Sequence, residues 1–563
     1  MHVVYSLRFM FSESFFTKVC FGFLFLFYTA TIVLLFLQNS FSPTFSTDSW
    51  GYFDISKSIF HNFYQVSYVR QYQVDPQYGI SFPPLYPFVI AIGNTFWHLG
   101  IYSGYIFNGF IAIATLCMLL LLSKRITSFA LPGFVMFLAL FSHKDYVGEL
   151  VSARSIPLTI FLLCVWLFVF LRRKLSKVHI IILGILAGLL ALNRFDFFIP
   201  GILLGVPLLW NTQIAKTKAV IFYYACFFLA ISPWIIYSLM HFHTLYISDN
   251  ERTVFLAFRS STLDYFPASA HVQSLFTSPV RWTLYRVLFI GSITLYAFVA
   301  MVYYNPVVQQ LLWSTVFLFF AYSLIDKYTK HISFDSHRIW YFKTLLILFP
   351  MFFFQLYTIS LTGFSDMRYG LVFLLYSCLL LLAIVIVFAQ QMLKRKHLSI
   401  LVSLVTLLWV SSYIFNSFSE QFSALTTKHI GLNQNIIRPD KQFSRIADEL
   451  RKKSDSPIIL VHGRGDKAIY AEKFGSLTGI RTLEEPGNVN NAILVDVVKQ
   501  YHVTHVQTSC HYWISTLKQH FVMEKTATPY LYYIKGKKQS PRMSKDMQSI
   551  YPDEKFKDCI GAL

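Results

Sequence analysis

Two carboxylates stand among aromatic residues in the stretch FSTDSWGYFDISKSIF, residues 45–60, which follows directly on the first long apolar run of the chain. Asp48 and Asp54 are six residues apart, so on a helix that begins near residue 48 they lie on different faces. A positioned carboxylate can act as a general base and take a proton from an attacking hydroxyl group. We expect Asp48, at the junction of loop and helix, to project into a cavity at a membrane surface, and Asp54 to face water.

The other interpretation of Asp48 is a helix cap. Thr47, Asp48 or Ser49 could cap the first turn of an amphipathic helix, and an aspartate at the boundary between membrane and water stays solvated at little cost. The apolar residues that would share one face of this helix are Tyr52, Ile55, Ile59 and Phe60. Which interpretation holds depends on the elements that position the aspartate, and first on whether a membrane is present.

The composition is that of a polytopic membrane protein. Of the 563 residues 55% are hydrophobic and 18% aromatic, whereas only 13% are charged, a balance that soluble domains of this length do not have. Apolar runs of about 17 to 22 residues recur, long enough to cross a hydrocarbon core of roughly 30 Å as helices. The first run, residues 19–37, is too long for the apolar part of a signal peptide and lacks a small-residue cleavage site after it, so we expect an uncleaved helix.

The net charge of +20 indicates membrane topology rather than nucleic-acid binding, because much of the basic charge lies in short clusters between apolar runs. Under the positive-inside rule each cluster marks a cytoplasmic turn. The clusters are Lys124-Arg125, Arg172-Arg173-Lys174 with Lys177, Lys216 with Lys218, and Lys394-Arg395-Lys396. The seven cysteines show no CxxC spacing, so neither a zinc site nor a disulfide framework is predicted, and a bridge between Cys510 and Cys559 stays open.

These signals predict a transmembrane domain, residues 1–417, with about 11–13 membrane-spanning helices. Residues 39–102 form a first outer loop and residues 239–283 a second large one. Inside the first loop, FPPLYPFVIAIGNTFWHLG opens with two prolines, and we expect it to lie along the membrane interface. The expected helices cover about 18–38, 103–122, 128–142, 155–171, 178–192, 197–210, 219–238, 344–361, 371–390 and 399–416. If the runs 284–304 and 306–325 both crossed the membrane, the number of crossings would exceed by one the number that the basic clusters require.

Residues 418–563 are predicted to form a separate α/β domain on the extracytoplasmic side. Their composition is mixed polar, and the helical patterns SRIADELRKK and NVNNAILVDVVKQY alternate with the strand patterns PIILVHG, VTHVQT and PYLYYIKG. Alternating strands and helices are typical of a layered α/β fold. The expected fold class is therefore a polytopic α-helical membrane protein with a C-terminal extracytoplasmic α/β domain, located in the cell (inner) membrane.

The order of several sequence features resembles the GT-C membrane glycosyltransferases, which include the protein O-mannosyltransferases and the aminoarabinose transferases of lipid A. In that superfamily an aspartate follows the first helix, and an aromatic juxtamembrane helix precedes a Pro-Pro motif. The matching residues are Asp48, Tyr52 and Pro83-Pro84-Leu85-Tyr86; further likenesses are Asn193-Arg194-Phe195-Asp196, Pro233-Trp234 and Arg368-Tyr369. The order of a membrane domain and an outer α/β domain is similar too.

The resemblance implies transfer of a sugar from a polyprenyl-phosphate donor to a lipid, glycan or protein acceptor on the outer side of the membrane. Asp48 is then the candidate general base, because an acceptor hydroxyl is a poor nucleophile until its proton is taken. Inverting chemistry would place it on the face opposite the leaving phosphate. The lipid-linked sugar is the donor substrate, a divalent metal is compatible with the chemistry, and no nucleic acid is expected as a partner.

A second acidic residue often comes from the next outer loop in this superfamily, where it binds an acceptor or a metal. Asp145 and Glu149 are the candidates here, with a solvated loop as the alternative. The segment Ser152-Ala153-Arg154 departs from the family pattern, because Arg154 stands where an acid would be expected.

The leaving lipid phosphate would need cations at the bilayer surface, and arginine forms paired, charge-assisted hydrogen bonds to phosphate. Arg368 and Arg194 both lie in expected outer turns, and Arg70 in the first outer loop is a third candidate. The alternative for each is ordinary anchoring at the membrane interface.

One motif of the tail indicates a different function. ILVHGRGDKA places Gly463, Gly465 and Ala468 in GxGxxA spacing after a strand, with Glu484 and Glu485 about 20 residues further on, as in a dinucleotide-binding fingerprint. The expected topology places this domain away from the cytoplasmic dinucleotide pool, so we prefer a turn in a Rossmann-like accessory domain.

Two other classes of protein remain as alternatives. An O-antigen ligase or polymerase also has many helices, but it carries its large loop between late helices. A multi-pass transporter places ionisable groups at mid-depth in the membrane and often has repeated halves. The candidate acids of this chain cluster instead in outer loops.

Overall fold

The computed structural model describes two parts of the chain. In the N-terminal half it covers residues 26, 47–60, 68–69, 82–127, 137, 140, 144–172, 174–208 and 215–242. In the C-terminal part it covers residues 441–461, 474–475, 477–484, 494–495, 498–499, 501–508, 511–528 and 530–537. Arg70, Arg368, the three fingerprint positions from Gly463 to Ala468, and most of the second outer loop lie outside the described residues.

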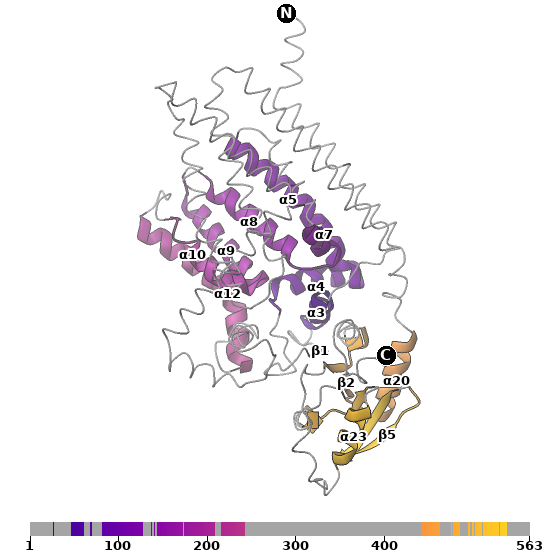
Figure 1. Ribbon diagram of the computed structural model, residues 1–563. Helices are drawn as coiled ribbons and strands as arrows, with labels where there is room; N and C mark the ends of the chain where they lie inside the picture. The colour runs from indigo at the N-terminus through magenta and orange to yellow at the C-terminus, as the bar shows by residue number, and fades with distance from the viewer. Residues whose placement is uncertain are drawn as a thin grey trace, which may run out of the picture.

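The N-terminal half is a set of packed helices, which we call the helical part (Figure 1). It contains α3 (Thr47–Ser58), α4 (Leu85–Trp97), α5 (Ser103–Thr127), α7 (Lys144–Val151), α8 (Ile156–Phe170), α9 (Lys177–Asn193), α10 (Phe198–Leu203) and α12 (Lys216–Phe242), with 3-10 turns at Gly100–Tyr102 and Phe195–Phe197. The helices predicted over 103–122, 155–171, 178–192 and 219–238 are confirmed to within a few residues. Among the described residues, Ser103–Ile126 and Lys216–Met240 are long and apolar enough to cross a membrane.

Helix starts follow local sequence signals. The α8 helix begins after Ser155 with a proline in its first turn, a position where the missing N–H has no intrahelical partner to lose. The α9 helix begins with a capping box, in which Ser176 and His179 each satisfy a backbone N–H of the first turn. Both signals mark where a helix begins, and α9 has the side-chain cap.

Close helix packing relies on two glycines four residues apart. A Cβ atom added at Gly184 would lie 2.4 Å from the carbonyl oxygen of Tyr223, and one at Gly188 would lie 2.5 Å from the Cβ of Ala230. The glycines therefore let α9 approach the backbone of α12, as small residues do between membrane helices.

The α3 helix is enclosed, and this corrects two expectations from the sequence. Every residue from Ser49 to Ser56 is buried, so the helix does not present one apolar and one polar face. Asp54 is 3% exposed and does not face water. Its charge acts on the Lys57 ammonium group, whose pKa is lowered by burial and partly restored by the nearby aspartate. Sequence periodicity does not predict this enclosure, because it depends on the packing of α3 against α4 and of Ile55 against Trp234 and Tyr237 of α12.

The C-terminal part holds a six-stranded sheet in the order β1-β3-β2-β4-β6-β5. Its strands are β1 (Tyr68–Val69), β2 (Ile458–Val461), β3 (Arg481–Glu484), β4 (His505–Gln507), β5 (Phe521–Lys525) and β6 (Leu531–Lys537), with helices α20 (Lys441–Lys453) and α23 (His511–His520). The first four strands of that order run parallel, and β6 is antiparallel to β4 and β5. The predicted α20, β2, β4 and β6 are confirmed, whereas β1, β3, β5 and α23 were not predicted.

The outermost parallel strand, β1, comes from the first outer loop rather than from the tail. Tyr68 pairs with Thr482 and Val69 with Leu483. Leu477 forms a second link, because it packs against the apolar core of the C-terminal part and also against that of the helical part. The two parts are therefore joined at the β3 edge of the sheet.

Candidate active site

Tyr52, on the second turn of α3, contacts residues from several of the segments that the sequence marks as candidate site elements. Its hydroxyl oxygen lies 3.0 Å from the Oγ of Ser155, at the start of α8. Its ring packs edge-on against Tyr86 at 5.0 Å between centroids and in a tilted arrangement against Phe82 at 4.8 Å. The Pro-Pro-Leu-Tyr segment thus lies directly beside α3, as the predicted site requires.

Asp48 lies in the first turn of α3, four residues before Tyr52, and its side chain is half-buried. Residues four apart share a helix face, so the carboxylate and the phenol lie on the same side of α3. A negative charge in the first turn is favoured by the partial positive charge of the helix N-terminus. The position of Asp48 is therefore compatible with a role as general base and with a role as helix cap.

Three of the predicted site residues act electrostatically on Tyr52. Burial raises the pKa of its phenol most, the carboxylates of Asp48 and Glu149 raise it further, and Arg194 lowers it. Tyr52 therefore keeps its proton at neutral pH and acts as a hydrogen-bonding group. The structure brings Asp48, Glu149 and Arg194 together around one side chain, although they are far apart in the sequence.

Arg194 caps the C-terminal end of α9, where a cation is favoured by the helix dipole. Its Nε and Nη2 donate to the two carboxylate oxygens of Asp196 at 2.9 and 3.2 Å. Next to it, the ring of Phe195 packs 5.3 Å from that of Trp234 in α12, and Trp234 shares a small apolar cluster with Ile55 of α3. The motifs Asn193–Asp196 and Pro233-Trp234 thus lie beside the first-loop motif.

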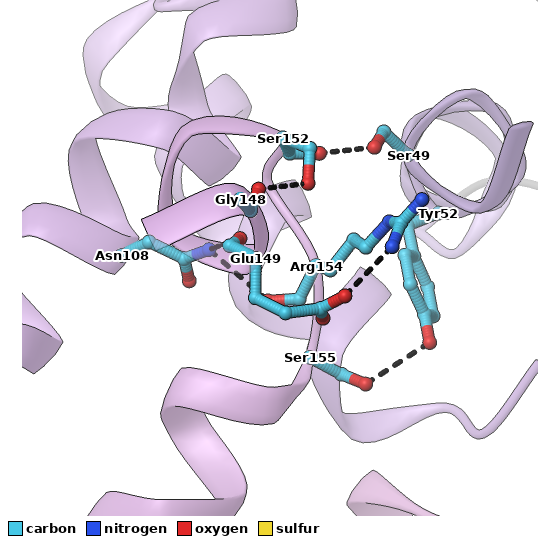
Figure 2. A network of polar contacts seen from close by, with 8 residues as sticks. All are labelled: Ser49, Tyr52, Asn108, Gly148, Glu149, Ser152, Arg154 and Ser155. Atoms are coloured by element: carbon cyan, nitrogen blue, oxygen red, sulfur yellow. Dashed lines mark hydrogen bonds and ion pairs between the residues drawn. The ribbon is translucent and has the colours of Figure 1, made fainter. Parts of the chain in front are cut away.

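Glu149 forms an ion pair with Arg154, the residue that departs from the family pattern. Arg154 donates from Nη1 to Oε1 of Glu149 at 2.7 Å, with side chains 23% and 2% exposed respectively (Figure 2). The chain turns back after α7 because Ala153 adopts a left-handed conformation, with φ of 52°. This turn brings the side chain of Arg154 back to Glu149 on α7. The periodicity of the sequence does not predict the turn. Asp145 lies four residues before Glu149 on the same helix.

A network of neutral hydrogen bonds holds this turn in place (Figure 2). The Nδ2 of Asn108, in α5, donates to the carbonyl oxygens of Glu149 and Arg154 at 3.3 and 3.0 Å. The Oγ of Ser49 donates to the carbonyl oxygen of Ser152. Tyr86 donates to Oδ1 of Asn108 at 3.0 Å. The turn after α7 is therefore tied to α3, α4 and α5, and the charged groups are held on a fixed frame.

Comparison with protein-family models gives no match, and comparison of the sequence with curated proteins gives none either. Comparison with solved structures gives a match across nearly the whole chain. The crystal structure of ArnT from Cupriavidus metallidurans in the apo state superposes with a TM-score of 0.51 at 12% sequence identity, covering 92% of this chain and 98% of that chain. The chain has the fold of ArnT.

A second crystal structure of the same ArnT, bound to undecaprenyl phosphate, gives a TM-score of 0.47 at 12% identity, with 91% and 97% of the chains covered. We base the comparison of folds on the apo structure. Since ArnT is an aminoarabinose transferase of the GT-C type, the predicted resemblance is confirmed at the level of the fold, and the fold is that of a polytopic membrane protein.

Metal ligands are not gathered in the part of the chain that the structure describes: no group there holds three or more His, Cys, Asp or Glu side chains. Glu149, one of the two predicted ligands, already has the guanidinium of Arg154 against its carboxylate. The described residues of the candidate site offer a half-buried carboxylate (Asp48), a protonated phenol (Tyr52) and two arginines (Arg154 and Arg194), each paired with an acid.

Proposed function

We propose that the protein is a membrane glycosyltransferase that moves a sugar from a polyprenyl-phosphate donor to a lipid, glycan or protein acceptor on the outer side of the cell (inner) membrane. The observation that carries the proposal is the gathering of Asp48, Tyr52 and Arg194 within an ArnT-like fold. A carboxylate beside a cation suits a reaction in which one oxygen loses a proton while another leaves as a phosphate.

The reaction would begin when the acceptor hydroxyl attacks the anomeric carbon of the donor sugar. Asp48 takes the hydroxyl proton, the new bond between the acceptor oxygen and carbon forms, and the bond between carbon and the phosphate oxygen breaks. The electron pair of the broken bond leaves on the lipid phosphate. Tyr52 is unsuited to act as the base, because its raised pKa keeps the phenol protonated.

Cations must offset the charge on the leaving phosphate. Arg194 is the described candidate, since Asp196 fixes its guanidinium plane by accepting hydrogen bonds from Nε and Nη2 along one edge. Arg368 and Arg70 remain proposed for the same role. We assign Glu149 to positioning rather than to proton transfer, because it is almost fully buried and paired with Arg154.

The strand pairing supports a common side for the first outer loop and for residues 418–563. Tyr68 and Val69 can pair with β3 only if both segments lie on the same side of the membrane. The basic residues Lys124 and Arg125 end α5 at the opposite end from the site loops, and under the positive-inside rule this supports an extracytoplasmic site side.

The test is substitution of Asp48 by asparagine, which keeps the shape and the capping oxygen but cannot take a proton at neutral pH. We expect sugar transfer to fall about 10²–10⁴-fold, with expression and membrane insertion unchanged. The measurement is the glycolipid and glycoprotein profile of cells in which the gene has been deleted and replaced by a copy that encodes either the parent protein or the variant. If Asp48 is only a cap, transfer stays near normal, because asparagine caps as well as aspartate.

Asp54→Asn is the matched control on the same helix. It removes a buried charge that lies near Lys57, so we expect lower thermal stability but normal transfer per folded molecule. Loss of transfer from Asp54→Asn with transfer intact in Asp48→Asn would reverse the assignment of the two carboxylates.

A further inference from the structure

The edge of the C-terminal sheet is completed by two residues of the first outer loop. Within the described sheet, β3 pairs on one side with β2 and on the other with β1, in the register Tyr68 to Thr482 and Val69 to Leu483. An uncovered edge strand presents unpaired N–H and C=O groups, and adding a strand satisfies them. The tail therefore binds the first outer loop by strand addition, a mode otherwise used to capture extended peptides.

The loop that the tail binds connects the two helices that build the candidate site. Tyr68 follows Phe60, two residues after the end of α3, by eight residues, and Phe82, three residues before α4, follows Val69 by thirteen. At no more than about 3.6 Å per residue, the first of these connections spans less than about 30 Å. A fixed β1 therefore restricts where the end of α3 can lie.

A pairing of two residues is a weak contact by itself, and a second contact reinforces it. Leu477, four residues before β3, packs against the core of the helical part, to which Trp50, Tyr52 and Tyr86 belong. The same side chain packs against the core that contains Phe474 and Ile480. The β3 edge thus contacts the loop through β1, and the segment just before β3 contacts the core of the helical part (Figure 1).

We propose that the C-terminal part is a positioning element of the active site: through β3 and Leu477 it holds the first outer loop, and through that loop it keeps α3 and α4 in contact. The proposal rests on the proposed function for what α3 does, but not for how it is held. Asp48 and Tyr52 lie on α3, so release of β1 should loosen the site without altering any group in it.

Strand pairing is tested first by cross-linking, which needs no activity. The variant Tyr68→Cys/Thr482→Cys places two thiols on paired residues, and neighbouring strands lie at a separation that a disulfide can bridge. A protease site inserted between residues 418 and 440 of the full chain then allows the two fragments to be separated. We expect the cleaved fragments to stay together on a non-reducing gel and to separate after reduction.

Tyr68→Cys/Glu524→Cys is the matched control. Glu524 lies on β5, at the opposite edge of the same sheet, and its side chain is 42% exposed. Its thiol is therefore accessible but has no β1 residue opposite it. We expect no link in this variant, and the two single-cysteine variants show whether natural cysteines contribute.

Coupling to the site is tested by Val69→Pro, which removes a backbone N–H from β1, with Val69→Ala as the control that keeps it. A reporter cysteine replaces Ser56, a buried residue of α3 that accepts a hydrogen bond from Asn94 of α4 at 3.2 Å. We expect the rate of reaction with a maleimide to rise at least tenfold in Val69→Pro relative to Val69→Ala. Sugar transfer, measured without the reporter, should fall at least tenfold.

The outcomes separate this proposal from the proposed function. If the cross-link does not form, or if the reporter reacts equally in the proline and alanine variants, the positioning role is overturned even if the protein is a glycosyltransferase. If the cross-link and the reporter respond but the parent transfers no sugar, the positioning role stands and the proposed function fails. Normal transfer in Val69→Pro with an exposed reporter would show that α3 does not need to be held, and would also overturn the proposal.

Discussion

Glu149 and Arg154 pair a nearly inaccessible carboxylate with a partly exposed guanidinium. We expect Arg154→Met to destabilise the protein by about 2 kcal/mol, because it leaves the carboxylate of Glu149 enclosed without this partner; a fully buried pair would lose about 3–5 kcal/mol. The double variant Glu149→Gln/Arg154→Met should lose less than the sum of the two single variants. Thermal unfolding in detergent measures all three, and additive losses would show that the pair does not couple.

His505, at the centre of the sheet, gives the C-terminal part a pH-dependent stability. Burial lowers the pKa of its imidazole to about 4 from the usual 6.5, an effect that Glu449 opposes and Lys453 increases slightly. Between these two values the unfolded chain binds the proton and the folded chain does not, so stability falls as the pH drops from about 6.5 towards 4. We expect His505→Gln to flatten this dependence in thermal unfolding of the full protein between pH 4 and 7. An unchanged pH slope would contradict the assignment to His505.

Single residues of the site were predictable only where a local signal marked them. Asp48 and Tyr52 stand in an aromatic stretch after the first apolar run, and the structure places both on the predicted helix. Arg154 was not predicted as the partner of Glu149, because their contact depends on a left-handed turn at Ala153. Asn108 was missed for a related reason: its amide reaches a turn some 40 residues away, and nothing in its own helix marks it.

At the scale of elements, the close contact of α9 with α12 depends on glycine. We expect Gly188→Ala to destabilise the protein by about 1–3 kcal/mol, the usual range for overpacking, because the new methyl group would lie 2.5 Å from Ala230 and 2.9 Å from the carbonyl oxygen of Phe227. Gly148→Ala, in α7, meets nothing within 4 Å and should be neutral or stabilising by up to about 1 kcal/mol. Thermal unfolding of the two variants side by side provides the measurement. Equal effects would mean that α9 can move away from α12.

The helices were easier to predict than the strands, and the reason is physical. An apolar run of membrane-spanning length carries its own signal, so α5, α8, α9 and α12 follow from the sequence alone. The β3 and β5 strands span only four and five residues of mixed polarity, and their burial is set by neighbours in the sheet. No local pattern predicts β1, because its partner lies at the far end of the chain.

At the scale of the whole molecule, the proposed topology makes a direct prediction. Cysteines replacing Phe60 and Tyr530, whose side chains are 47% and 48% exposed, should react with a membrane-impermeant maleimide in intact cells. A cysteine replacing Lys174, which is exposed at the end of α8, should react only after the membrane is permeabilised. Equal labelling of positions 60 and 174 in intact cells would overturn the topology. Protection of position 530 would also overturn it, and would favour the dinucleotide interpretation of the tail.

The pairing of β1 with β3 also sets an order of events during synthesis. Val69 precedes Arg481 by 412 residues, so at about 5–20 residues per second the ribosome needs roughly 20–80 seconds to supply the partner strand. In the proposed topology, the first outer loop crosses the membrane and the helices around it are inserted before the partner strand of β1 has been made. The β1–β3 pairing is therefore completed late in synthesis, and a chain that stops before β3 would leave the first outer loop without its partner strand and open to proteases or chaperones.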